Sequence, residues 1–173
     1  MTFTSNPSTD TAQINKPTLK LGSKGEVVKE LQNLLLDQGV FLYISGDGAC
    51  VYPGGEVIDG IFGLKTEAGV KLFQGLMFQQ QDGIVGNKTW RSLYKGAPVD
   101  MAVLKKGVKG ELVQKVQERL STGGYYNRAI DGDFGTATET AVKELQKSTS
   151  LPIDGVIGER TWFELSKITT IIC

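Results

Sequence analysis

The stretch IDGIFGLKT, residues 58–66, occurs with small changes three more times in this chain of 173 residues. The other copies are QDGIVGNKT, IDGDFGTAT and IDGVIGERT, which end at Thr89, Thr138 and Thr161, and all four fit D-G-x-x-G-x-x-T. Asp before Gly favours a tight turn, because its carboxylate can accept the N–H two residues on, and the first Gly reaches positive φ without steric cost. We expect the x-x pair to supply apolar side chains and the second Gly to permit a close approach of the chain. The Thr should lie in or near the first turn of a helix. We interpret the phrase as scaffold.

The four copies belong to a longer internal repeat. LGSKGEVVKELQNLL (21–35) matches KKGVKGELVQKVQERL (105–120) at an offset of 85, whereas Asp59 matches Asp131 at an offset of 72. The 13 residues by which the offset falls are an insertion in the first copy. We therefore expect two homologous lobes. The expected segments are a polar N-terminal extension (1–18), lobe 1 (19–96, with the insertion at about 45–57), a linker (97–100), lobe 2 (101–168) and an apolar C-terminal tail (169–173).

Each lobe is expected to contain three helices, because apolar residues recur at helical spacing. The second helix covers residues 66–74 in lobe 1 and 138–146 in lobe 2, and the third is short and carries Trp90 or Trp162, which we place in the core. Residues 40–44 have strand character. The predicted class is mainly α, with two tandem small three-helix lobes and a possible β-hairpin insertion in the first. The other residues expected to face the two cores are Val28, Leu31, Leu35, Val70, Phe73, Leu93, Val113, Val116, Leu120, Val142, Leu145 and Leu165.

Charge and composition exclude several classes of function. Lys plus Arg and Asp plus Glu both number 19, so there is no broad basic surface for nucleic acid or for an anionic membrane. Histidine is absent, which excludes a Ser-His-Asp triad, a Cys-His pair and the usual zinc hydrolase site. Neither DGD (131–133) nor GDG (46–48) has the ligand spacing of a calcium loop. We expect no cofactor, no metal and no catalytic residue, and we predict that the chain is not an enzyme.

The stretch GGYYNRAIDGDFGTATETAVKELQKSTSLPIDGVIGERTWFEL (123–165) closely resembles the peptidoglycan-binding domain 1 family. Members of that family read much like G-Y-Y, then D-G-x-F-G-x-x-T-x-x-A-V-x-x-F-Q, then L-x-x-D-G-x-x-G-x-x-T-W. Lobe 1 departs from this pattern because it lacks the Gly-Tyr-Tyr element, carries the insertion and has Gly69 where the family has Ala. The resemblance implies a small three-helix fold that is usually attached to a cell-wall hydrolase and holds it on murein.

Peptidoglycan offers uncharged sugars and short peptides with both signs of charge, which suits a shallow groove with tyrosines and polar groups. The candidates lie in the loop of lobe 2 before its first D-G turn and within that turn, where side chains are least needed for packing. The alternative is that one of the two tyrosines, such as Tyr125, belongs to the core. The predicted ligand-binding residues are Tyr125, Tyr126, Asn127, Arg128 and Asp133.

The predicted function is non-catalytic binding of bacterial peptidoglycan by tandem modules, with lobe 2 the stronger binder. The first alternative is a structural or adaptor subunit of a phage-tail-like or contractile injection assembly, in which the termini and the lobe 1 insertion contact other proteins. The second is a murein hydrolase that uses carboxylates alone.

Residues 1–18 contain no apolar run, so we expect no signal peptide, and no segment approaches the ~20 apolar residues of a membrane span. Contact with the cell envelope would then follow cytoplasmic synthesis by another route. Cys50 and Cys173 are interpreted as free thiols, with a disulfide as the alternative in an oxidising compartment.

Overall fold

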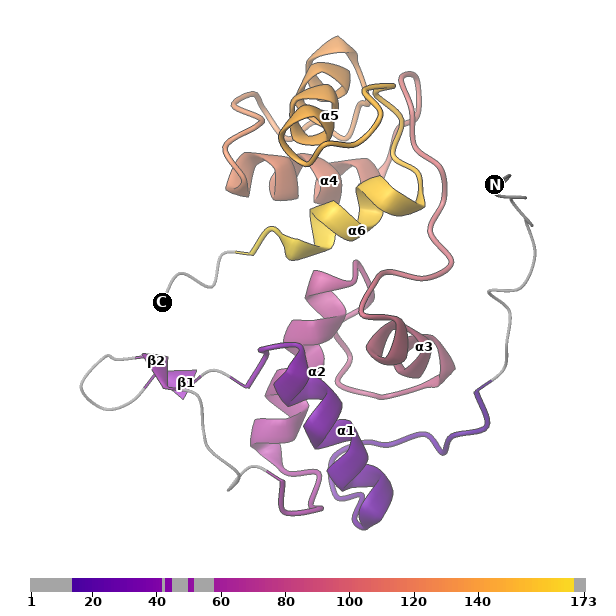
Figure 1. The fold of residues 1–173 in the computed structure, drawn as a ribbon, viewed down its shortest axis with the longest axis vertical. Coiled ribbons are helices and arrows are strands. Elements are labelled where there is room, and N and C mark those ends of the chain that lie inside the picture. The colour runs from indigo at the N-terminus through magenta and orange to yellow at the C-terminus, as the bar shows by residue number, and fades with distance from the viewer. Residues whose placement is uncertain (1–13, 42, 45–49, 52–57, 170–173) are drawn as a thin grey trace.

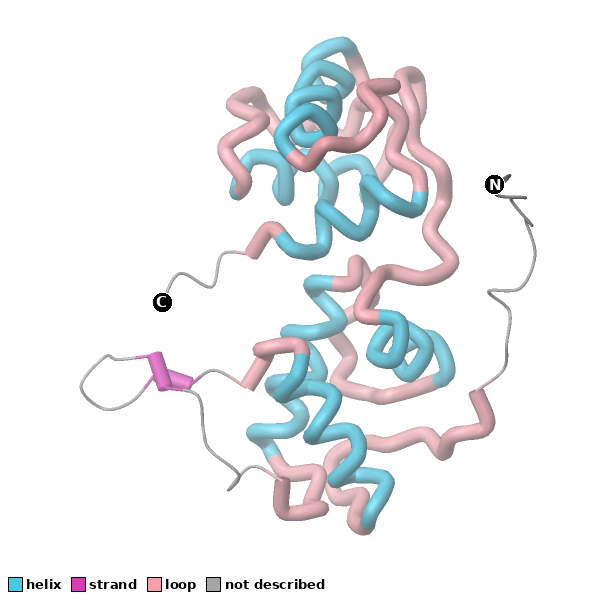
Figure 2. Tube along the Cα trace, viewed as in Figure 1, coloured by secondary structure: helices cyan, strands magenta, loops and turns pink. Residues whose placement is uncertain are grey.

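The computed structural model describes residues 14–41, 43–44, 50–51 and 58–169. Over these residues the helices fall into two groups of three, which Figure 1 shows stacked with α6 on the side of the second group that faces the first. Figure 2 shows that loops make up most of the remaining chain. The expectation of a mainly α protein with two three-helix lobes is confirmed. The helices are α1 (Glu26–Asp37), α2 (Leu64–Leu76), α3 (Asn87–Lys95), α4 (Glu111–Thr122), α5 (Thr136–Ser148) and α6 (Glu159–Lys167).

Each lobe has its own hydrophobic core, built by the helical stripes that the sequence predicts. Trp90 and Trp162, the largest of the buried side chains, are 0% and 1% exposed, so both are core residues as expected. The indole N–H of Trp90 donates to the carbonyl of Pro17 at 3.0 Å, and that of Trp162 donates to Ala102 at 2.9 Å. Their equivalence shows that the repeat includes residues just before the predicted start of lobe 1. All the other predicted core residues are buried as well: Val28, Leu31, Leu35, Val70, Phe73, Leu93, Val113, Val116, Leu120, Val142, Leu145 and Leu165.

Residues 14–18, which the sequence places in a polar extension, lie against lobe 1. Ile14 packs on its core, and the side-chain amide of Asn87 donates to the Ile14 carbonyl at 3.4 Å. Leu19 pairs with Val85 through two backbone hydrogen bonds of 3.2 and 2.8 Å. This segment therefore covers the start of α3, at the place where residues before Leu104 cover α6 in lobe 2.

Two short strands lie at the insertion, β1 (Tyr43–Ile44) just before it and β2 (Cys50–Val51) within it. They pair antiparallel, with Tyr43 opposite Val51 and Ile44 opposite Cys50. Residues 45–49 and 52–57, the first 13 residues and residues 170–173 with Cys173 lie outside the described residues. The predicted protein contacts of the termini and of most of the insertion fall there, as does the question of a Cys50–Cys173 disulfide.

The two lobes touch through side chains from both. Phe78, which follows α2, packs edge-on against Trp162 with ring centroids 4.9 Å apart and belongs to the core cluster of lobe 2. Arg119 on α4 donates to the carbonyl of Gly75 in lobe 1 at 2.8 Å. Lys95 at the end of α3 forms a 2.7 Å ion pair with Glu159 at the start of α6. The lobes are therefore packed on one another.

Candidate functional site

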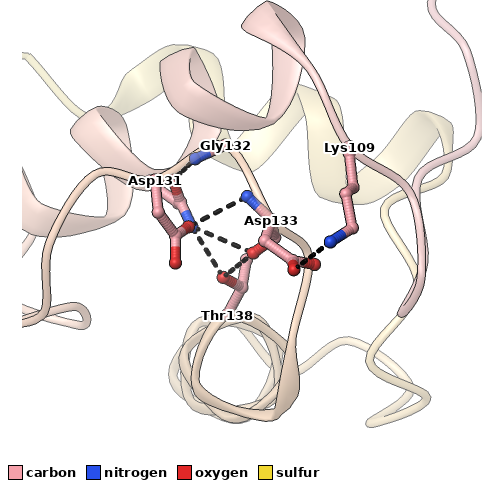
Figure 3. A network of polar contacts seen from close by, with 6 residues as sticks. Lys109, Asp131, Gly132, Asp133 and Thr138 are labelled. Carbon is pink, nitrogen blue, oxygen red and sulfur yellow. Dashed lines mark hydrogen bonds and ion pairs between the residues drawn. The ribbon is translucent and has the colours of Figure 1, made fainter.

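A buried glutamine holds every D-G turn, and this contact explains why the phrase recurs. In the first turn of lobe 2, the Gln117 side chain donates through Nε2 to Asp131 Oδ1 at 2.7 Å and to the Asp133 carbonyl at 3.1 Å. Its Oε1 accepts the backbone N–H of Gly132 at 2.9 Å, and Nε2 also lies 3.1 Å from Thr138 Oγ1. Figure 3 shows this network around the turn. Gln32, Gln74 and Gln146 make the equivalent contacts in the other three turns.

The aspartate of each phrase forms the predicted turn. Its Oδ1 accepts the N–H two residues on, at 2.8–2.9 Å in all four copies. Hydrogen bonds from Gln117 first, and then from the backbone of Asp133, lower the pKa of Asp131. Gln32 and the Ile61 backbone lower the pKa of Asp59 in the same way. The turn itself therefore favours the charged form of the Asp59 and Asp131 carboxylates, as expected of structural groups.

The two glycines of the phrase have different outcomes. The first Gly takes positive φ as expected, 71–73° in all four copies. The second Gly was expected to permit a close approach, but this is wrong, because a Cβ at Gly63, Gly86, Gly135 or Gly158 would meet nothing within 4 Å. Each of these glycines is instead the residue before a helix, in extended conformation and without a side-chain cap. The Thr is the third helical residue, where its hydroxyl contacts the buried glutamine that holds the turn. We call this residue the clamping glutamine.

The x-x pair also differs from the expectation, because only its second residue is a buried apolar side chain. Phe62 and Phe134 are 0% exposed, as are Val85 and Ile157 in the second turn of each lobe. The first residue of the pair faces outward, and Ile61 is 45% exposed. Asp133 occupies that outward position in lobe 2. The outward residue is thus a part of the turn that can take a role beyond folding.

Tyr126 was predicted to contact ligand, but its side chain lies in the core and is 5% exposed. Its hydroxyl donates to the carbonyl of Ala129 at 3.0 Å and accepts from Gln117 Nε2 at 3.2 Å. The alternative that one tyrosine is core is therefore correct, but the core residue is Tyr126 and not Tyr125. The sequence could have signalled this, because Tyr126 aligns with Phe41, which precedes the insertion and is 4% exposed.

The remaining candidates lie at the surface of lobe 2. Tyr125 is half-buried, and its hydroxyl is 2.8 Å from Ser148 Oγ on α5. Asn127 and Arg128 are exposed. Asp133 forms a 2.6 Å ion pair with Lys109, which raises the pKa of that lysine and which Figure 3 shows at the edge of the turn. The structure thus leaves four of the five predicted binding residues accessible in part or in full.

A second group of charged side chains in lobe 2 surrounds Glu139. Glu139 on α5 lies 2.7 Å from Lys143 and 3.5 Å from Lys106, and these lysines lower the pKa of Glu139. Among the described residues no group of three or more Cys, Asp or Glu side chains is placed to hold a metal ion. Within the same part of the chain no helix is long and apolar enough to cross a membrane. The surface can offer charges of both signs and amide groups to a ligand.

These features define a class of protein, a tandem repeat of small three-helix modules with turns held by glutamine and a polar surface loop. The family model described as "Putative peptidoglycan binding domain" matches residues 24–93 and 109–165. The two matched segments together cover most of the chain, one in each lobe. This chain belongs to that family, with two tandem copies of its domain.

The chain is also similar to several named proteins and to solved structures. The N-acetylmuramoyl-L-alanine amidase CwlL of Bacillus licheniformis is 30% identical over 185 aligned positions, which cover 95% of this chain and 50% of the relative. The N-acetylmuramoyl-L-alanine amidase CwlM of Mycobacterium tuberculosis is 28% identical, covering 83% of this chain and 36% of the relative. Among solved structures, the N-terminal domain of SleB is 38% identical, with a TM-score of 0.38, covering 38% of this chain and 90% of that one.

These relatives correct one prediction. The absence of histidine led us to predict that the chain is not an enzyme, but the relatives that match over most of its length are named amidases. The chain spans between about a third and a half of the length of those relatives. The absence of histidine excludes particular sets of catalytic residues and does not by itself exclude every class of enzyme.

Proposed function

We propose that this protein binds peptidoglycan through its tandem lobes and that this binding serves enzymatic cleavage of the cell wall. The observation that carries the proposal is the family match in both lobes, separated by the short linker. Two lobes on one chain increase the effective concentration of each for a polymer, provided that both can reach it together. The amidases named among the relatives supply the class of reaction. The place of action would be the cell envelope.

The exposed loop of lobe 2 is the proposed contact surface for the polymer. Asn127 and Arg128 project from the loop next to the buried Tyr126, whose hydrogen bonds hold the backbone there. A rigid loop loses little conformational entropy on binding. Tyr125 adds a half-buried ring at the base of the loop. Lobe 1 has the insertion at the equivalent place, so we expect it to contribute less.

Co-sedimentation with purified peptidoglycan sacculi tests the binding. The parent protein should sediment with the sacculi, and Arg128→Ala should lower the sedimented fraction several-fold. Lys147→Ala removes an exposed positive charge from α5 of the same lobe and is the matched control, which should bind like the parent. If neither the parent nor the control sediments above the level without sacculi, the binding proposal is refuted.

Release of soluble fragments from the same sacculi tests the catalytic part. An amidase that cuts between the glycan and the stem peptide would generate new amino groups, which are counted after labelling. A rise above a heat-treated sample supports cleavage by this chain. Binding without any rise would refute cleavage by these 173 residues and would leave the binding proposal intact.

A further inference from the structure

A groove of about 730 Å³ lies between the two lobes. Its volume is within the range of pockets that hold small ligands, roughly 300–1,000 Å³. One side is formed by the end of α2 and the segment that follows it, and the other side is formed by α4. The lining residues that determine its chemistry are Leu72, Leu76, Gln80, Gln81, Lys115 and Glu118.

Arg119 gives this groove a fixed shape by joining the lobes behind it. Its guanidinium donates to the carbonyl of Ile168 at 2.6 Å and to that of Gly75 at 2.8 Å, and it lies 4.8 Å from the centre of the Phe78 ring. Burial lowers the pKa of Arg119, and hydrogen bonds from such a desolvated cation are stronger than between neutral groups. Phe78 has φ of 56°, a conformation that is unfavourable for a bulky residue, and its ring packs on Trp162.

The residues that build the groove are not required by the repeat. At the positions equivalent to Arg119 and Phe78, the other lobe has Leu34 and Ser150. The glutamine run 79–81 corresponds to Leu-Pro-Ile at 151–153. Each lobe forms the three-helix fold with its own set, so the fold itself does not require Arg119, Phe78, Gln80 or Gln81. Gln79 differs from these, because it bonds Ser92 and Thr89 within lobe 1. The joint placement of the other four residues at the lobe boundary indicates a role for the boundary itself.

The chemistry of the lining matches a peptide better than a sugar. Gln80 and Gln81 are exposed and offer amide groups that can pair with a peptide backbone. Lys115 forms a 2.9 Å pair with Glu111 at the surface, where such a pair is weak and can exchange partners. The exposed Glu118 adds a second carboxylate. The groove therefore presents amides and both signs of charge along one line.

Aromatic faces, on which a sugar ring could stack, are not open in this groove. Phe78 is the aromatic residue in its lining, and its ring is 8% exposed, with Arg119 over its face. Leu72 and Leu76 supply half-buried aliphatic surface instead. Small aliphatic side chains, such as alanine methyl groups, fit such a surface. We propose that the groove between the lobes binds the stem-peptide part of peptidoglycan. This inference rests on the proposed function and adds a site and a ligand fragment to it.

NMR titrations in which the backbone amide chemical shifts are monitored test the inference. The probes are a synthetic peptidoglycan stem tetrapeptide and, separately, the N-acetylglucosamine–N-acetylmuramic acid disaccharide without peptide. The tetrapeptide should shift the amides of Gly75, Gln80 and Thr122, and the disaccharide should leave them in place. Lys115→Gln and Glu118→Gln should each weaken tetrapeptide binding at least threefold.

The matched controls carry the same chemical changes outside the groove. Lys147→Gln and Glu144→Gln alter exposed residues of α5 and should bind the tetrapeptide like the parent. The inference is overturned if the tetrapeptide shifts only residues 125–128, if the disaccharide alone shifts the groove, or if the controls weaken binding as much as the groove variants. Sedimentation with sacculi but no groove shift would overturn this inference alone. Failure to sediment would overturn the proposed function and this inference together.

Discussion

The two lobes share a scaffold but differ at the residue that each first turn presents to solvent. In lobe 2 this residue is Asp133, which is ion-paired with Lys109 at 2.6 Å. In lobe 1 it is Ile61, which is 45% exposed. One position further on, both lobes bury a phenylalanine completely. The comparison shows that the fold fixes the buried positions of the phrase and leaves the outward position to diverge.

A second difference lies beneath the surface, beside the clamping glutamine. Lobe 2 has Tyr126, whose hydroxyl bonds Gln117, and lobe 1 has Phe41 at the equivalent place. The ring of Phe41 occupies space above α2, where a Cβ added at Gly69 would lie 3.2 Å from it. The corresponding residue of α5 is Ala141, which is 2% exposed. The two lobes therefore reach the same packing with different pairs of residues.

The largest effect is expected from loss of a clamping glutamine. Gln117→Ala removes the acceptor of the Gly132 N–H and the donor to three oxygens of the turn, and we expect it to destabilise lobe 2 by about 3 kcal/mol. Gln32→Ala should cost lobe 1 somewhat less, because Gln32 has no tyrosine hydroxyl beside it. Gln114→Ala on the same helix is exposed and should change stability by less than about 0.5 kcal/mol.

Fluorine NMR of 5-fluorotryptophan-labelled protein measures these effects lobe by lobe. The chain has two tryptophans, Trp90 in lobe 1 and Trp162 in lobe 2, so each lobe has its own resonance. Urea titrations followed at both resonances give a separate midpoint for each lobe. If Gln117→Ala left the Trp162 midpoint unchanged, the glutamine would not be the element that holds the turn.

Coupling between the lobes should depend next on Arg119. Arg119→Leu introduces the residue found at the equivalent position of lobe 1, and it leaves the carbonyls of Gly75 and Ile168 without this donor. We expect a loss of about 2 kcal/mol, since hydrogen bonds from a charged group contribute ~1.5–3 kcal/mol. The midpoints at the two fluorine resonances should then lie further apart than they do in the parent. Equal midpoints in the variant would show that other contacts couple the lobes.

The sequence predicts repeated structure well and unique structure poorly. The helical stripes, the buried tryptophans and the left-handed glycine of each turn follow from local spacing, because each is a consequence of one element. The glutamine clamp was missed, since Gln117 and Asp131 lie on different elements and a buried amide resembles a surface one in sequence. Tyr126 was misplaced because a tyrosine suits both a core and a ligand surface, although its alignment with Phe41 favours the core. The groove at Arg119 depends on how the lobes dock, which no repeat encodes.

A smaller effect is expected when the hydroxyl that distinguishes the lobes is removed. Tyr126→Phe gives lobe 2 the ring of lobe 1 and deletes hydrogen bonds to Ala129 and from Gln117. The cost should be about 1 kcal/mol at the Trp162 resonance, a typical value for a buried hydrogen-bonded hydroxyl. Binding to sacculi should stay within twofold of the parent, because the ring remains buried. A large loss of binding with unchanged stability would show that the Tyr126 hydroxyl contacts the ligand.

The smallest effect is expected at Gly69, where the missing side chain leaves space for the Phe41 ring. Replacing a glycine by alanine inside a helix ordinarily stabilises it by about 1 kcal/mol. At Gly69 the new methyl group would meet the Phe41 ring at 3.2 Å, closer than ordinary contact, so we expect Gly69→Ala to change the Trp90 midpoint by less than about 0.5 kcal/mol. The mirror change, Ala141→Gly, has no such offset and should cost lobe 2 about 1 kcal/mol or more. In a Phe41→Leu background the smaller side chain leaves room for the methyl group, and Gly69→Ala should then recover its full gain. A double-mutant cycle over the parent, Phe41→Leu, Gly69→Ala and the double variant measures the coupling free energy between the two positions. A coupling of zero would show that the absence of a side chain at Gly69 is unrelated to Phe41.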